Sequence, residues 1–228
     1  MKFPIEIKAV AFDLDGTLVE TLPDLHEAAN RMLAQLGRSA VSESIVRAFI
    51  GDGVDRLVKR LLTGEHEGEP DAAAFEKAAA DFRGHYGSVL IRASHAFPGA
   101  VSVLEILRNR GVKLACVTNK PARFTEPLLQ GLGLTAYLDL IISGDSLPRK
   151  KPDPLPLLHA ARVFGIDPVQ LLMVGDSAVD TAAARAARCP VFCVPYGYRG
   201  TLTVQELDCD AIVATLPDIL DLISIKRS

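Results

Sequence analysis

Two aspartates, Asp13 and Asp15, stand directly after an apolar run in the stretch Val-Ala-Phe-Asp-Leu-Asp-Gly-Thr. Residues 7–12 have the length and branched apolar content of a buried strand, and Gly16 marks the turn that ends it. Open α/β sheets bind ligands at this carboxyl edge. Carboxylates this close repel each other, and the repulsion is relieved only if a cation or a proton is supplied. A metal ion would use both, with Asp13 as a nucleophile toward a phosphoryl group and Asp15 as its acid/base partner; a solvated turn is the plainer alternative.

Polar side chains also follow three later apolar runs, 112–117, 138–142 and 171–174, which the pattern predicts as strands. Because parallel strands end at one edge of a sheet, we expect these side chains beside the first two aspartates. Taken singly, each has a structural explanation as a helix cap or a solvated loop residue. In chain order they are Thr118, Asn119, Lys151, Asp176, Ser177 and Asp180.

The expected cluster has the composition of a phosphate site with a metal. The lysine, the threonine hydroxyl and the asparagine amide supply positive charge and hydrogen-bond donors for a phosphate. Four carboxylates in one cleft need a divalent cation, and all-oxygen ligands favour Mg²⁺ over zinc. Asp176 is expected to bind the metal directly. Asp180, one helical turn later, would reach the metal shell or orient a metal-bound water or Lys151, and Ser177 would support that shell or simply cap the helix.

Helical and strand-like periods divide the chain into two parts. Strands alternating with helices predict an α/β core, a doubly wound, mostly parallel, Rossmann-like sheet formed by residues 1–19 and 93–228. Four helical stretches without a strand between them predict an all-helical cap over residues 20–92, inserted after the first strand, with hinges near 20–23 and 92–97. Within the cap, Gly51-Asp52-Gly53 predicts a flexible loop whose backbone can approach a small anion and select the substrate.

Composition excludes several classes of partner. The chain has 228 residues, 49% of them hydrophobic, and a net charge of -3 without a basic cluster, so we expect no nucleic-acid partner. No apolar run reaches membrane-spanning length and no signal-peptide pattern is present, which favours a cytoplasmic protein without a membrane partner. Cys116 is expected to be a small buried apolar residue. Cys189 and Cys193 leave a structural or redox pair open.

In four ordered motifs the chain resembles the haloacid dehalogenase-like hydrolase superfamily: Asp13-Leu14-Asp15-Gly16-Thr17, Thr118, Lys151, and Gly175-Asp176-Ser177 with Asp180. The resemblance covers nearly the whole chain, and the helical insert is similar to that superfamily's four-helix cap. It implies a phosphatase that works through an aspartyl-phosphate on Asp13, with Asp15 as acid and then base. It also implies that Mg²⁺ is held by the carboxylates of Asp13 and Asp176 and by the backbone carbonyl of Asp15.

A narrower pattern bears on the substrate. Residues 50–54, 118–121, 151–154 and 196–198 resemble those of bacterial members that act on 2-phosphoglycolate, which implies hydrolysis of this small phosphate ester to glycolate and phosphate. Glu20-Thr21, where those members usually have Asp-Ser, departs from the pattern. Pyrophosphate or a sugar phosphate as substrate, a phosphomutase, a phosphonatase with a cap lysine, a phospho-accepting signalling domain and an inactive binding protein remain alternatives. A monomer or a homodimer is expected.

Overall fold

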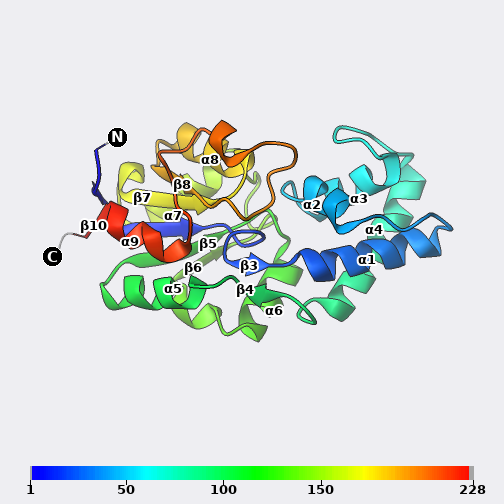
Figure 1. The fold of residues 1–228 in the computed structure, drawn as a ribbon, viewed down its shortest axis with the longest axis horizontal. Helices are drawn as coiled ribbons and strands as arrows, with labels where there is room; N and C mark the ends of the chain where they lie inside the picture. Colours follow the sequence, from blue (N-terminus) through cyan, green and yellow to red (C-terminus); the bar gives the residue numbers. More distant parts are fainter. Residues whose placement is uncertain (1, 226–228) are drawn as a thin grey trace.

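A six-stranded parallel sheet forms the centre of the molecule in the computed structural model, which describes residues 2–225 (Figure 1). Its strands lie in the order β6-β5-β2-β7-β8-β9. Counted along the chain, this order is 3-2-1-4-5-6, that of a doubly wound Rossmann-like sheet, so the predicted fold class is confirmed. The strands are β2 (Ala9–Phe12), β5 (Lys113–Val117), β6 (Leu140–Ile142), β7 (Leu171–Gly175), β8 (Val191–Cys193) and β9 (Ala211–Ile212).

Helices cover both faces of this sheet (Figure 1). Strand β2 shows why, since Ala9 and Ala11 pack into one apolar cluster while Val10 and Phe12 pack into another, and all four are fully buried. The alanine side receives the small-residue faces of α7 (Leu155–Phe164) and α8 (Ala178–Ala187). The other side receives α5 (Ala100–Asn109), α6 (Ala122–Gly131) and α9 (Ile219–Leu222). A strand buried on both faces reads as an unbroken apolar run.

Four helices make a separate layer beyond one end of the sheet, seen at the right of Figure 1. They are α1 (Leu22–Gln35), α2 (Glu43–Phe49), α3 (Val54–Thr63) and α4 (Ala72–Val89), within two residues of the stretches that the periodicity predicts. Helix α4 begins where the Asp71 carboxylate accepts a hydrogen bond from the Ala74 N–H at 3.0 Å. Helix α3 ends at Gly64, whose φ of 76° is the left-handed conformation of a glycine cap.

The two segments that join this helical layer to the sheet are tied to each other. Strands β3 (Val19–Glu20) and β4 (His95–Ala96) pair antiparallel at this junction. Next to them the fully buried Asp24 carboxylate accepts hydrogen bonds from the Ser94 N–H at 2.8 Å and from its hydroxyl at 2.6 Å. The sequence predicts hinges near these positions but not the strand pair, because a pairing of two residues is too short to leave a periodic signal. The division into core and cap at these positions stays a prediction.

Smaller elements complete the chain. Strands β1 (Ile5–Glu6) and β10 (Ile223–Ser224) pair in parallel. Strand β2 begins at Ala9, two residues after the start of the strand predicted over 7–12. Four 3-10 turns lie at Thr135–Tyr137, Pro168–Gln170, Val204–Glu206 and Leu216–Asp218. The four cysteines are free, Cys116, Cys189 and Cys193 being buried. Within residues 2–225 no helix has the length and hydropathy to span a membrane. Residues 1 and 226–228, the ends of the predicted core, lie outside the described part.

Candidate active site

The candidate site lies where the order of the strands reverses direction. Strands β2 and β7 are neighbours there, with Phe12 opposite Val174, and the Asp13 N–H donates to the Val174 carbonyl at 2.9 Å. Asp13 and Asp176 therefore leave adjacent strand ends, one residue beyond each strand. Ligands of open α/β sheets bind at this switch point because the loops on its two sides diverge and leave a crevice.

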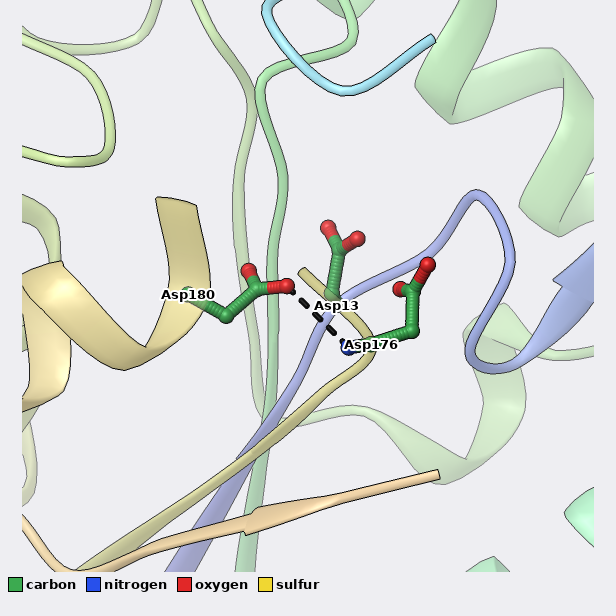
Figure 2. A group of neighbouring side chains, drawn as sticks. All are labelled: Asp13, Asp176 and Asp180. Atoms are coloured by element: carbon green, nitrogen blue, oxygen red, sulfur yellow. Dashed lines mark hydrogen bonds between the residues drawn. The ribbon is translucent and has the colours of Figure 1, made fainter. Parts of the chain in front are cut away.

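Three carboxylates converge in this crevice, as Figure 2 shows. One oxygen each from Asp13, Asp176 and Asp180 lie within 4.8 Å of one another, and the three residues are at most 9% exposed. Burial raises the pKa of Asp13 to about 7, with Lys151 opposing the shift and Asp180 adding to it. Burial, followed by repulsion from Asp180 and Asp13, raises the pKa of Asp176 well above its usual range. The site therefore favours a bound cation, which would let these groups ionise together.

Asp176 is held in place from two loops. The Thr17 hydroxyl donates to its Oδ1 at 2.6 Å, and the Tyr198 backbone N–H donates to its Oδ2. Gly16 lies against the same carboxylate with φ +88°, and a Cβ at that position would stand 2.7 Å from the Asp176 Oδ2. Only glycine fits both the conformation and the space. The Asp-Gly-Thr turn after β2 thus shapes the pocket around a residue that lies about 160 positions later in the chain.

Lys151 supplies the positive charge between two of the carboxylates. Its Nζ donates to Asp13 Oδ1 at 2.8 Å and to Asp180 Oδ1 at 2.6 Å, and its side chain is 2% exposed. Burial opposes the charge, yet Asp13 and Asp180 together raise the pKa of Lys151, so it stays protonated. Asp180 Oδ2 accepts from the Ser177 N–H at 3.1 Å and from its hydroxyl at 2.7 Å. The contact between Asp180 and Lys151 matches one of the roles expected for Asp180, the orientation of Lys151.

Asp15 lies apart from the group of three carboxylates. Its Oδ1 accepts a hydrogen bond from the Lys120 Nζ at 2.9 Å, and that Nζ also donates to the Tyr86 hydroxyl of α4 at 2.6 Å. Sequence reasoning missed Lys120 and Tyr86 as members of the site. Lys120 could have been found from its place in the same strand-end loop as Thr118 and Asn119. Nothing in the sequence marks Tyr86 of α4 as its partner.

Thr118 and Asn119 lie at the end of β5 under the cap loop. The Thr118 N–H donates to the Ile142 carbonyl at 2.9 Å, and the hydroxyl oxygen accepts from the Lys120 N–H at 3.2 Å. The Asn119 side-chain amide donates to the carbonyls of Gly51 at 3.1 Å and Lys151 at 2.9 Å. Both of its N–H groups are thus engaged, and the side chain joins cap to core. Its expected contact with a phosphate would require these bonds to open, and it stays a prediction.

The predicted cap loop rests on this strand-end loop. The Lys150 Nζ donates to the Asp52 carbonyl at 2.5 Å, and Gly53, with φ +90°, lies so near the Asn119 carbonyl that a Cβ would stand 2.9 Å from its oxygen. Between cap and core a cavity of about 40 Å³ remains, against about 10–15 Å³ for one water. It is lined by Asp13, Asp15, Thr118, Asn119 and Lys120 of the core and by Leu25, Ile50, Gly51, Gly53, Val54 and Leu57 of the cap.

A family model for haloacid dehalogenase-like hydrolases matches residues 7–188. This range includes every residue of the candidate site described above except Tyr198. The chain belongs to this family. The matched residues include all four of the ordered motifs, from Asp13 to Asp180. The match also includes the helical layer, which lies between the first motif and the second in the chain.

Among similar proteins, a phosphoglycolate phosphatase of Thiobacillus denitrificans is 55% identical over 216 residues, which are 95% of each chain. A phosphoglycolate phosphatase of Nitrosospira multiformis is 51% identical over 223 residues, 98% of each chain. The crystal structure of a predicted phosphoglycolate phosphatase from Haemophilus somnus superposes with a TM-score of 0.89 at 36% identity, covering 94% of this hydrolase and 96% of that chain. The match extends through sheet and cap alike.

Proposed function

We propose that this hydrolase is a Mg²⁺-dependent phosphatase that cleaves 2-phosphoglycolate to glycolate and phosphate. The observation that carries the proposal is the position of Lys151, a buried ammonium held by Asp13 and Asp180 beside Asp176. Such an arrangement offers a nucleophilic oxygen, a positive charge for a phosphate and a carboxylate pair for a metal in one crevice.

The residues fit a hard divalent cation. Their donors are carboxylate oxygens, which Mg²⁺ prefers, and burial leaves Asp13 and Asp176 with raised pKa values that a cation would reverse. The carboxylates of Asp13 and Asp176 and the backbone carbonyl of Asp15 would hold the ion. Asp180 is better suited to positioning, because its two oxygens already accept from Lys151, Ser177 and Asp176. When bound, Mg²⁺ supplies positive charge that draws the phosphate to a carboxylate nucleophile.

Asp13 and Asp15 divide the first step of the reaction between them. A carboxylate oxygen of Asp13 attacks phosphorus, a bond to phosphorus forms, and the bond to the ester oxygen breaks. Asp15, in its protonated form, gives its proton to the departing oxygen, which leaves as an alcohol. Lys151 and the Thr118 hydroxyl stabilise the phosphoryl oxygens during transfer.

The second step returns Asp13 to its starting form. Asp15, now ionised, takes a proton from a water molecule, whose oxygen attacks the phosphorus of the aspartyl-phosphate. The bond between phosphorus and the Asp13 oxygen breaks, and phosphate leaves. A closed cap keeps other water out of the crevice, and contacts of the loop 51–53 with Asn119 and Lys150 support this role for the cap.

Two observations support 2-phosphoglycolate over larger phosphate esters. Relatives 55% and 51% identical over nearly their whole length are named phosphoglycolate phosphatase. The cavity is bounded on the cap side by Ile50, Gly51, Gly53 and Val54 and on the core side by Asp13 and Asp15, so a compact ligand fits between the two layers. A phosphonatase would need a lysine in the cap that reaches the cavity, but Lys59 bonds Glu69 at 2.6 Å and Lys77 is exposed, and neither lines it.

The deciding experiment measures kcat/KM for phosphate release with Mg²⁺. The panel contains 2-phosphoglycolate, pyrophosphate, glucose phosphates, phosphonoacetaldehyde and nucleotides. We expect a clear preference for 2-phosphoglycolate. Preference for another member would refute the substrate and leave the assigned chemistry standing, whereas a stable phospho-Asp13 without turnover would point to a phospho-accepting signalling domain.

A further inference from the structure

Lys120 is a buried cation that the proposed chemistry does not use. Its side chain is 2% exposed and its Nζ lies 4.6 Å from the centre of the Tyr86 ring. Among the described residues, that Nζ donates to Asp15 Oδ1 and to the Tyr86 hydroxyl. An ammonium has three N–H donors, so one remains for a ligand. Of the residues that line the cavity, Lys120 is the one with a positive charge.

The position of Lys120 relative to Asp15 says which part of a substrate it can reach. An acid that protonates a leaving oxygen must lie within hydrogen-bond distance of it. The Lys120 Nζ is 2.9 Å from Asp15 Oδ1, so it lies beside the leaving group, whereas Lys151 is bonded to Asp13 at the phosphoryl end. The two lysines therefore serve opposite sides of the bond that breaks.

A negative group on the leaving side would need such a cation. In the phosphate ester of a 2-hydroxy acid, one carbon separates the ester oxygen from the carboxylate, so the carboxylate has to lie close to Asp15. Without a counter-charge the two carboxylates would repel each other in a crevice shielded from water. A neutral leaving group has no such requirement, so the cation at position 120 would add nothing to the binding of that group.

We propose that Lys120 is the specificity residue of the site, and that it binds the carboxylate of the leaving group. The substrate class is then the phosphate esters of 2-hydroxy carboxylic acids. This inference rests on the proposed phosphatase function and adds to it the residue that recognises the acid. Tyr86, fully buried on α4 of the cap, is the positioning residue that holds the ammonium in place.

The test compares two substrates within each enzyme. Wild type, Lys120→Met and Lys120→Gln are assayed on 2-phosphoglycolate and on 2-hydroxyethyl phosphate, which has a hydroxymethyl group in place of the carboxylate. We expect wild type to prefer 2-phosphoglycolate, and both variants to lose about 10- to 150-fold of that preference, the range of a charge-assisted hydrogen bond. Lys113→Met is the matched control, because Lys113 lies at the start of β5, away from the site, and pairs with Asp139 on the surface; this variant should keep the wild-type ratio.

The ratio of the two kcat/KM values separates specificity from other effects. A loss of folded protein, or of support for Asp15, lowers both rates and leaves their ratio unchanged. Variants whose ratio stays within about twofold of wild type would therefore overturn the role of Lys120, as would a wild type without preference. A wild type that hydrolyses neither ester would overturn the phosphatase function as well.

Discussion

Replacement of Asp13 by Asn should stop turnover and, without metal, stabilise the fold. The nucleophilic oxygen is lost, so we expect kcat to fall by several orders of magnitude. The same carboxylate is buried against Asp180 and Asp15, and its pKa is raised from 3.8 to about 7. A group whose pKa rises on folding binds more protons in the folded state than in the unfolded one, so it lowers stability as the pH climbs from about 4 to about 7.

The size of the effect follows from the shift. A rise of about three pKa units corresponds to roughly 4 kcal/mol of lost folding stability. This loss is present above pH 7 and is small near pH 4. Asn has a similar shape and no charge to bury. For a chain of this length 1 kcal/mol moves the melting temperature by roughly 2–4 °C, so metal-free Asp13→Asn should melt about 8–16 °C above wild type at pH 8, with the difference shrinking towards pH 4.

Scanning calorimetry in chelator at pH 4, 6 and 8 measures this directly. Asp208→Asn is the control, because that carboxylate is 76% exposed and should show no such trend. Mg²⁺ should narrow the gap at pH 8 by stabilising wild type alone. A metal-free Asp13→Asn protein that melts below wild type at pH 8 would refute the argument that burial of this charge is costly. Activity within about tenfold of wild type, after allowance for deamidation, would refute the nucleophile.

Two further substitutions test the surroundings of the site. Gly53→Ala places a Cβ 2.9 Å from the Asn119 oxygen at a φ of +90°, so kcat/KM should fall about 5- to 150-fold. Gly64→Ala shares the strain of a positive φ, +76°, but has open space around it, so it should leave kcat/KM unchanged. Equal effects of the two on kcat/KM would argue against contact of the cap loop with the core. Asp180→Asn removes the negative charge beside Lys151. In a metal titration this variant should show apparent Mg²⁺ affinity or activity lower by about 10- to 100-fold. A change below twofold in both quantities would contradict the positioning role of Asp180.

Much of the site was predictable because the sheet places it. A buried strand ending in polar residues is visible in sequence, and parallel strands bring such ends to one edge, so Asp13, Lys151 and Asp176 could be grouped without coordinates. The same logic gives the four cap helices from their apolar stripes. What periodicity cannot give is which atoms touch. Asp180 had three possible roles in sequence, and only coordinates place its oxygen 2.6 Å from the Lys151 Nζ.

The contacts that escaped prediction join segments without a shared period. Lys120 lies 105 residues from Asp15 and 34 from Tyr86, and its charge in sequence is indistinguishable from that of a solvated loop lysine. The contact of the Asn119 amide with a phosphate stays a prediction, but its hydrogen bond to the Gly51 carbonyl of the cap loop had no signal in the sequence. The β3–β4 pair is likewise fixed by tertiary packing, because two residues a strand carry little local preference.

These contacts between cap and core lead us to expect that the cap takes part in the chemistry as well as in the choice of substrate. Asp15 is bonded to Lys120, and Lys120 to Tyr86 of α4, so a chain of two hydrogen bonds runs from the cap to the proposed acid. Opening the cap would remove the Tyr86 hydroxyl from Lys120 and the Gly51 carbonyl from Asn119 at the same time. The arrangement around Asp15 is therefore complete only when the cap lies on the core. In the proposed mechanism, closure would therefore both exclude water and position the Asp15 carboxyl, so phosphoryl transfer would require a ligand small enough to let the cap close.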